Sequence, residues 1–427
     1  MGNVSQRHEY EESLREVPPM TRSVEAELPV WPPVNAARGP FALLAEDEQE
    51  RYAAPVTRVR LPTGATAWLV SRHADVRRLL RHPAFSSDLT RPGFPLLRPL
   101  PPQTAEDGKG SFIRMDGAEH SRLRRMLTAE FMIKNVRRIE PLITQTVDRC
   151  LDDLAAVGPP ADLVSTFALP LPSMVICHLL GVPYADHDFF QAHSRTLLSR
   201  NEPMERVQAA VRELQSYLRQ LAQERLAHPD AAADDLLSRL VRERVEPGEL
   251  ELDELVGMAL LLLIAGHETT ANMLGLSVLL LTRRPDQFAL LRDEPERVAD
   301  LVEELLRYLS IVRTGLARVA TEDVEIGGQL IRAGEGVIVL IALANRDTEV
   351  FDDAEGFDPY RQAHQHLAFG FGVHQCIGQP LARAELRLAL VGLARRFPDL
   401  RVTAEPEQLP IRDNAVVFGL DVLPVSW

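Results

Sequence analysis

One cysteine of this chain has neighbours that suit it to hold a metal or a cofactor. Cys376 lies in the segment Phe369–Gly378, FGFGVHQCIG, directly before a helical pattern. Glycines such as Gly370 and Gly378 allow a tight turn and the close approach of a flat ligand, and Phe369 can shield the sulfur from water. The helix that follows offers free amide hydrogens and a positive dipole end to a thiolate. The alternative is a buried, inert cysteine in a glycine-rich turn.

An acid beside an alcohol interrupts the most apolar stretch of the chain, Leu255–Leu281. Thr269 can bond the carbonyl four residues back or release it, which opens a helix locally, and Glu268 beside it forms a proton-relay pair. Gly266 lacks a Cβ, so another group can approach the helix there. The alternative is a packing glycine followed by two threonines without chemistry. Because charge in mid-span is costly in lipid, we expect a long buried helix of a soluble protein with no membrane anchor.

Two further helical patterns place charged side chains on one face. His120 and Arg124 are four residues apart, and Glu304 and Arg307 are three apart, so each pair can meet on a helix surface. Taken alone, the first pair is typical of a solvated basic helix and the second of a surface ion pair. Their meaning therefore depends on the rest of the sequence.

Composition excludes several classes of protein. The 427 residues carry a net charge of −14, which argues against nucleic-acid binding and against adsorption to anionic lipid. Cys150, Cys177 and Cys376 form no CxxC motif and no disulfide framework, so we expect a reducing, cytoplasmic location and a core position for Cys150 and Cys177. Residues 1–20 lack the apolar core of a signal peptide. Because Met20 offers a second start, we interpret residues 1–19 as a disordered or dispensable extension.

The periodicity predicts a mainly α protein with a small β-sheet region, in one domain over residues 20–427. Helical spacing dominates 135–307, and a loop with five prolines and three glycines, Leu89–Ser111, precedes it; such long loops are usually functional. We expect strands at Val56–Leu61, Ala67–Ser71 and within Val324–Ile341, and further helices at His73–Arg81, Ala118–Met126 and Pro380–Phe397.

The pattern FxxGxxxCxG closely resembles the haem-binding signature of the cytochrome P450 superfamily. The resemblance runs over nearly the whole chain and is greatest to soluble actinobacterial members of secondary metabolism. It implies the P450 fold, with haem b between the long central helix and the cysteine loop, and Cys376 as the iron ligand. Ala265–Thr270 resembles the oxygen-activation segment A/G-G-x-D/E-T. By that resemblance Thr269 holds the oxygen and water network, Glu268 feeds protons, and Ala265 and Gly266 lie against the cofactor.

The resemblance also gives roles to the scattered charges. His120 and Arg124 form the HxxxR pair of the family, and they, with Arg318 and His374, are expected to bind the haem propionates. Glu304, Arg307 and Arg361 are expected to form the structural lock behind the haem. The residues expected to line a substrate pocket are Phe94, Leu96, Leu97, Ile264, Ile311, Val312, Thr314, Val417 and Phe418.

The expected activity is O2-dependent hydroxylation of a hydrophobic small molecule, such as a polyketide, macrolide or terpenoid, by a monomeric enzyme. Epoxidation, dealkylation and ring formation share the scaffold and remain alternatives. We find no bound-flavin or nicotinamide fingerprint, so ferredoxin and its reductase should supply electrons. Segment 114–138 holds seven Lys/Arg against three Asp/Glu and could dock an acidic donor through Arg122, Arg125, Lys134, Arg137 and Arg138.

Two hypotheses of other classes compete with this one. His364, His366, His374 and Cys376 form a ligand-rich cluster that could bind zinc or copper without haem. Alternatively, the chain could be a haem carrier or sensor that performs no oxygenation, although Glu268 and Thr269 argue against this.

Overall fold

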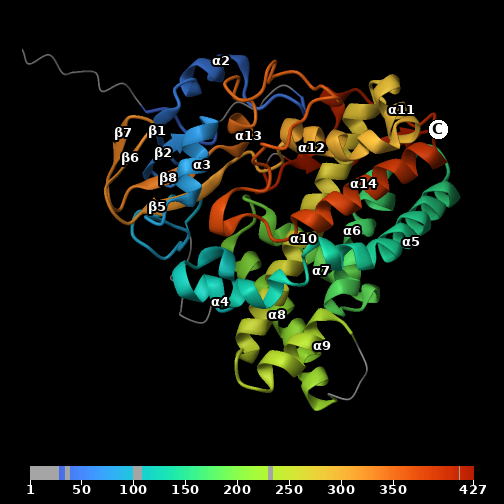
Figure 1. The fold of residues 1–427 in the computed structure, drawn as a ribbon, viewed down its shortest axis with the longest axis horizontal. Coiled ribbons are helices and arrows are strands. Elements are labelled where there is room, and N and C mark those ends of the chain that lie inside the picture. The colour runs from blue at the N-terminus through green and yellow to red at the C-terminus, as the bar shows by residue number, and fades with distance from the viewer. Residues whose placement is uncertain (1–27, 34–38, 100–107, 229–233, 413) are drawn as a thin grey trace, which may run out of the picture.

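Long helices form the larger part of the molecule and surround one central helix. The computed structural model describes residues 28–33, 39–99, 108–228, 234–412 and 414–427; the expected extension 1–19 lies outside them. The central helix α10, Leu252–Thr282, runs through the body in Figure 1 and packs on α6, α8 and α14. The helices are α2 (Glu46–Gln49), α3 (His73–Arg81), α4 (Gly117–Thr128), α5 (Ile133–Val157), α6 (Pro170–Leu180), α7 (His187–Leu198), α8 (Met204–Ala227), α9 (Leu236–Leu240), α10, α11 (Pro285–Asp293), α12 (Val298–Leu309), α13 (Ile341–Ala344) and α14 (Gln379–Arg396).

The position of α10 follows from its composition. Within the described residues it is the one helix that is long and apolar enough to cross a membrane, yet most of that stretch is buried inside the protein. A helix that is apolar all round belongs in a core. A capping box between Glu251 and Glu254 fixes its start, with the Glu251 amide donating to Glu254 Oε2 at 2.9 Å.

A five-stranded sheet forms the second, smaller part at one side of the helices (Figure 1). Its order is β1-β2-β8-β5-β3, with β2 and β8 parallel and the other neighbours antiparallel. Short strands make three smaller sheets, β4-β12-β9, β6-β7 and β10-β11. The strands are β1 (Val56–Arg60), β2 (Thr66–Val70), β3 (Phe85–Ser86), β4 (Ala161–Asp162), β5 (Leu316–Ala320), β6 (Val324–Ile326), β7 (Gln329–Ile331), β8 (Gly336–Val339), β9 (Arg401–Val402), β10 (Ile411–Arg412), β11 (Gly419–Leu420) and β12 (Pro424–Ser426).

The mainly α fold with a small sheet region is confirmed, and so are the β1–β2 hairpin and the range of α3. The stretch expected as one set of strands, Val324–Ile341, divides into a separate hairpin, β6–β7, and the central strand β8. Arg318, which the sequence places before the strands, lies inside β5. The strands after α14 are two or three residues long, and such short segments form through pairing with distant partners rather than through local preference.

A fully buried ion pair joins α12 to the irregular segment that follows α13. Nε of Arg307 lies 2.6 Å from Oε2 of Glu304, and both side chains are 0% exposed. Nη1 of Arg307 also donates to the carbonyls of Asn345 and Ala354, at 2.8 and 2.7 Å, and Arg361 approaches Glu304 at 3.3 Å. The three residues expected to form a structural lock are therefore in contact. Glu304 and Arg307 are fully buried rather than on the surface, and Arg361 is half-buried.

A second ionic network lies one residue earlier on α12. Both carboxylate oxygens of Glu303 accept hydrogen bonds from Arg383 of α14, at 2.6 and 2.8 Å, and His366 Nε2 lies 3.0 Å away. Burial alone would raise the pKa of Glu303, but the hydrogen bonds from Arg383 and His366 outweigh it and lower the pKa to about 2. This network ties α12 to the helix that follows the cysteine loop.

Replacing Arg307 by lysine should destabilise the protein by about 3 kcal/mol or more. Arg307 donates to both Glu304 oxygens and to the carbonyls of Asn345, Ala354 and Gly356, and a lysine ammonium has too few donors to serve all of these buried groups. Urea unfolding followed by circular dichroism measures this. The matched control is Arg283→Lys, in an exposed pair with Glu405, where the change should stay within about 0.5 kcal/mol. Equal effects of the two substitutions would contradict a structural role for the buried pair.

Candidate functional site

The cysteine loop is a tight turn between the sheet side and α14. The amide of Cys376 donates to the carbonyl of Phe369 at 2.8 Å. Gly370 and Gly372 have φ angles of +70° and +76°, a region that favours glycine. At Gly372 a Cβ would lie 2.5 Å from the carbonyl oxygen of Leu80, so the loop requires glycine here for both conformation and contact.

The thiol of Cys376 combines two properties that rarely occur together. Surrounding protein desolvates it and thereby raises its pKa, although hydrogen bonds from the amides of Gly378 and Gln379 and the charges of Arg124 and Arg383 oppose the shift. Yet the residue is solvent-accessible. The sulfur is therefore reachable although protein surrounds it, and the amides at the start of α14 favour a thiolate there.

The other two cysteines behave as core residues. Cys150 and Cys177 are buried, and burial raises the pKa of each thiol to about 12. Neither is poised for chemistry, so the interpretation of both as core is consistent with the structure.

One face of α10 remains accessible in an otherwise buried helix. Ala265 is exposed and Thr269 is half-buried, and the Thr269 hydroxyl donates to the Ala265 carbonyl at 2.8 Å. Gly266 faces elsewhere, because a Cβ at this position would lie 2.9 Å from the side chain of Ile176 on α6. This favours the packing alternative for Gly266 over the expected contact with a cofactor.

Glu268 points away from that face into a cavity of about 240 Å³, which Asn272, Arg412 and Val417 also line. Its side chain is buried, and Oε2 pairs with Arg412 at 2.9 Å. The acid and the alcohol of the expected relay are therefore adjacent in sequence but differ in surroundings. No local sequence pattern indicates the role of Arg412, because nothing near it in the chain marks it as a partner of α10.

Four basic side chains converge beside the cysteine loop. The rings of His120 and His374 lie 4.2 Å apart, and Arg124 donates to the carbonyl of Gln375 at 2.5 Å. Burial and then the charges of His374 and Arg124 lower the pKa of His120 to about 4, and burial lowers that of Arg318 to about 10. Each of these shifts reports a charged form that is unfavourable without a counter-ion.

The carboxylate of Asp116 pairs with His374 of this cluster. Its Oδ1 lies 3.7 Å from His374 Nε2 and accepts from the Ser87 amide at 3.0 Å. Burial would raise the pKa of Asp116, but hydrogen bonds from His374, Ser86 and Ser87 lower it strongly instead. Nε2 of His120 is buried and has no hydrogen-bond partner within the described residues. The cluster therefore lacks negative charge, which a ligand bearing two carboxylates would provide.

The alternative metal site is not assembled. His364 pairs with Asp300 at 3.2 Å, His366 with Glu303 at 3.0 Å, and His374 with Ser87 at 3.0 Å. Within the described part of the chain, no group of three or more His, Cys, Asp or Glu side chains could hold a metal ion. The histidines around Cys376 thus serve separate partners.

The expected substrate-lining residues fall into two groups. Phe418 packs in the helical core and its amide donates to the Ile311 carbonyl at 2.9 Å, while Leu97 packs with Trp31 and Tyr52 against the sheet. The remaining expected residues are a buried side chain, Val417, and five half-buried side chains: Phe94, Leu96, Ile264, Val312 and Thr314. The structure gives Leu97 a packing role, and part of Leu89–Ser111 (100–107) lies outside the described residues.

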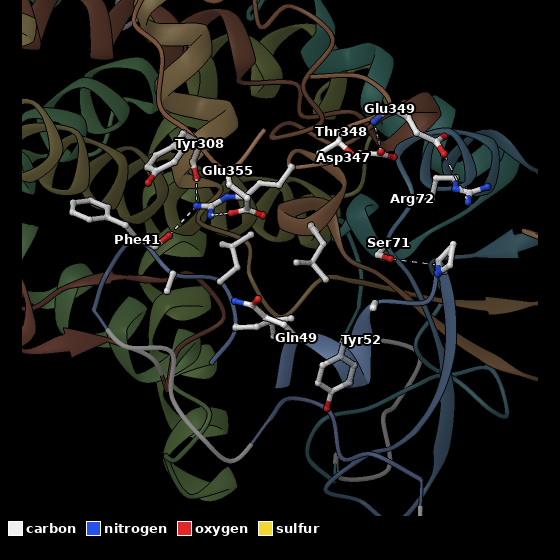
Figure 2. Close-up of a pocket in the computed structure, with 17 residues that line it drawn as sticks. Phe41, Gln49, Tyr52, Ser71, Arg72, Tyr308, Asp347, Thr348, Glu349 and Glu355 are labelled. Atoms are coloured by element: carbon white, nitrogen blue, oxygen red, sulfur yellow. Dashed lines mark hydrogen bonds and ion pairs between the residues drawn. The ribbon is translucent and has the colours of Figure 1, made fainter. Parts of the chain in front are cut away.

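A larger pocket, of about 640 Å³, lies elsewhere on the surface. In Figure 2, Arg72 and Glu349 stand on one side, Phe41, Tyr308 and Glu355 on the other. It contains none of the residues expected to bind cofactor or substrate, so size alone does not mark the chemical site.

The thiol of Cys376 is accessible and accepts hydrogen bonds from backbone amides, and four basic side chains beside it lack enough negative charge to balance them. This arrangement defines a site for a cofactor that a thiolate ligates and that carries acidic groups. Known proteins agree with this class. The family model for cytochrome P450 matches residues 39–420, and the chain belongs to the cytochrome P450 family. It is a monooxygenase of this family, which uses haem b and O2, and the bases and thiol described above fit that group.

The relatives are bacterial. Cytochrome P450-SU2 of Streptomyces griseolus is 49% identical over 92% of this chain and 96% of its own length. Pentalenic acid synthase of Streptomyces avermitilis is 46% identical over 88% of this chain and 92% of its own length. The crystal structure of mycinamicin VIII C21 methyl hydroxylase from Micromonospora griseorubida, bound to mycinamicin VIII, superposes with a TM-score of 0.86 at 43% identity, covering 94% of this chain and all of that one. The resemblance to actinobacterial members is thereby confirmed.

Arg318→Gln should accelerate loss of haem by about tenfold or more, because a hydrogen bond to a charged group contributes about 1.5–3 kcal/mol and each 1.4 kcal/mol is about tenfold. Transfer of haem to apomyoglobin measures the rate. Arg125→Gln, an exposed residue of α4, is the control and should change the rate less than about twofold. Indistinguishable rates for the two variants would remove Arg318 from the cofactor site.

Proposed function

We propose that the protein hydroxylates a hydrophobic natural product, with Cys376 as the ligand of the haem iron and electrons from a ferredoxin and its reductase. The desolvated yet accessible thiol of Cys376 carries this proposal. Relatives named for mycinamicin VIII, pentalenic acid and vitamin D3 support a bulky apolar substrate. Epoxidation, dealkylation and ring formation use the same scaffold. The bacterial relatives support a cytoplasmic enzyme of secondary metabolism, including antibiotic biosynthesis, and we propose that it acts as a monomer.

The chain's own residues prepare the site. Bound haem would supply O2 binding and the oxidising power that no side chain has. Arg124, Arg318, His120 and His374 would hold its two propionates, because burial lowers the pKa of Arg124, Arg318 and His120 and because Nε2 of His120 has no partner among the described residues. Phe369, with Arg383 stacked 4.6 Å from its ring centre, would exclude water from the sulfur side.

Thr269 and Glu268 would move protons on the opposite side. The Thr269 hydroxyl donates to the Ala265 carbonyl, and on rotating away it can hold water in the accessible face of α10. Glu268 would bring protons from the cavity behind it. This relay separates an oxygenase from a mere carrier of haem.

Cys376→Ser should abolish the red-shifted absorption of the reduced, carbon-monoxide-treated protein that thiolate ligation gives, because a serine oxygen is a weaker electron donor to iron. Difference spectroscopy of protein expressed with a haem precursor measures it. Cys177→Ser, at a buried cysteine away from the loop, is the control and should keep the peak. An unchanged peak in Cys376→Ser would contradict the proposal.

A basic and apolar surface beside the cysteine loop supports the choice of electron donor. Arg122 does not belong to it, because Glu119 and Glu254 both pair with Arg122. Large apolar side chains are also exposed there, with fractions from 55% to 66%, which is typical of a protein interface. The exposed members are Arg125, Met132, Ile133, Lys134, Arg137, Arg138 and, from the cysteine loop, Val373.

Arg137→Glu combined with Arg138→Glu should slow haem reduction by a plant-type ferredoxin by about tenfold at low salt, because repulsion replaces electrostatic attraction. Stopped-flow absorbance at increasing salt measures the rate, and the difference should shrink as salt screens the charges. Arg395→Glu combined with Arg396→Glu, at the opposite end of α14 from the loop, changes the net charge by the same amount and is the control. Equal rates in the Arg137/Arg138 variant and this control would exclude the surface as the docking site.

A further inference from the structure

Among the described residues, the carboxylate of Glu268 has one hydrogen-bond partner, and this partner comes from near the end of the chain. The side chain of Glu268 is 2% exposed, and its Oε2 accepts from Nη1 of Arg412 at 2.9 Å. Its other oxygen, Oε1, is buried and accepts no hydrogen bond from any described residue. Because an unpaired charge in a protein interior is costly, the position of Glu268 depends on Arg412.

Arg412 also contacts the surface. It lies in β10, directly opposite Gly419 of β11, and its Nε donates to Oδ1 of Asp421 at 2.8 Å. The Asp421 side chain is 52% exposed. One guanidinium therefore bridges a buried carboxylate on α10 and a carboxylate in contact with solvent.

The same three residues line one cavity. Its volume of about 240 Å³ is enough for several water molecules. Its walls come from α7, from α10 and from the β10–β11 hairpin, and most of the lining side chains carry charges or amides: Arg195, Glu202, Glu268, Asn272, Arg412, Asn414 and Asp421. A path of polar groups thus leads from the surface to the inner carboxylate.

The hairpin that carries Arg412 is attached to segments of the expected substrate pocket. The amide of Val416 donates to the Leu198 carbonyl at the end of α7, at 3.0 Å. On the other side, Phe418 bonds Ile311 through its backbone. The location of Arg412 is therefore set by the elements that would surround a substrate.

We propose that Arg412 is a positioning residue for proton delivery, which holds Glu268 at the inner end of this cavity until the acid takes up a proton. This proposal rests on the relay role of Glu268 and Thr269 proposed above. A water in the cavity protonates the carboxylate, and the neutral acid is no longer attracted to the guanidinium. The acid turns toward Thr269, gives the proton to water there, and returns as a carboxylate to Arg412. One proton enters and one leaves, and no electron moves.

Oxygen itself is the probe in the first experiment, so no organic substrate is needed. Pre-reduced holoenzyme is mixed with O2 and excess reduced plant-type ferredoxin, and O2 consumption is followed in H2O and in D2O. Glu268→Gln should slow consumption by about tenfold or more, since positioned acid–base groups contribute at least that much. Arg412→Gln should slow it by about threefold or more, with a larger D2O effect than the wild type. The double variant should be no slower than Glu268→Gln, because both changes act on one step.

A second readout does not depend on turnover. Thermal unfolding of the haem-loaded single and double variants should show that the two losses of Tm are not additive, because either substitution breaks the same ion pair. Arg283→Gln, in the exposed pair with Glu405, is the matched control, and its loss of Tm should add to that of either single variant. Arg412→Lys keeps the positive charge but lacks the planar guanidinium that donates to two carboxylates at once. It should recover part of the rate of O2 consumption, and it provides a test even if Arg412→Gln folds poorly.

The outcomes separate the two proposals. If Glu268→Gln consumes O2 as fast as the wild type, the relay itself is wrong. If Glu268→Gln is slow while Arg412→Gln is not, or if the two slowing factors multiply in the double variant, the relay stands and the role of Arg412 is overturned. Additive losses of Tm would equally exclude the pair as the functional unit.

Discussion

Four basic side chains held close together in a desolvated space must be offset by negative charge, and the cofactor end of this protein is arranged around that constraint. His120 and Arg124 come from α4, Arg318 from β5 and His374 from the cysteine loop. Burial lowers the pKa of Arg318 and contributes most to that of His120, so the cluster is unfavourable until an acidic ligand arrives. The ligand that neutralises the cluster also joins the sheet to the helices.

This arrangement explains why the thiol and the bases belong to one site. Arg124 contacts the cysteine loop through the Gln375 carbonyl and also favours the thiolate of Cys376 electrostatically. In the proposed function, binding of acidic groups by the bases and binding of iron by the sulfur would therefore each favour the other. On the other side, α10 offers a narrow accessible face in a helix that is otherwise core, which limits where oxygen and substrate can meet.

Much of this site could be predicted from the sequence because its signals are local. The turn at Gly370, the α14 start behind Cys376 and the i, i+4 pair in α4 each occupy a few consecutive residues, and the structure contains all of them. The burial of Glu304 and Arg307 was harder to predict from the sequence, because an ion pair three residues apart on a helix, taken alone, indicates a surface feature. Its acceptors at Asn345 and Ala354 are 38 and 47 residues away from Arg307, and no local pattern indicates them.

The same reason accounts for what could not be predicted. Glu268 and Arg412 are 144 residues apart, and β10 is too short to show strand periodicity. The sequence around Gly266 is compatible with contact to a cofactor and with packing against a neighbouring helix. Only the position of Ile176 on α6 distinguishes the two. Arg122 matches its neighbours in charge, but its pairing with Glu254 depends on how α4 meets α10.

The distances along the chain between Arg307 and its acceptors also set an order of assembly during synthesis. Arg307 leaves the ribosome first, the carbonyls of Asn345, Ala354 and Gly356 follow, and Cys376 comes after all of them. The wall behind the cofactor can therefore close before the sulfur exists outside the ribosome. Haem capture can then follow the closing of these rear contacts, because the cysteine loop is synthesised after them.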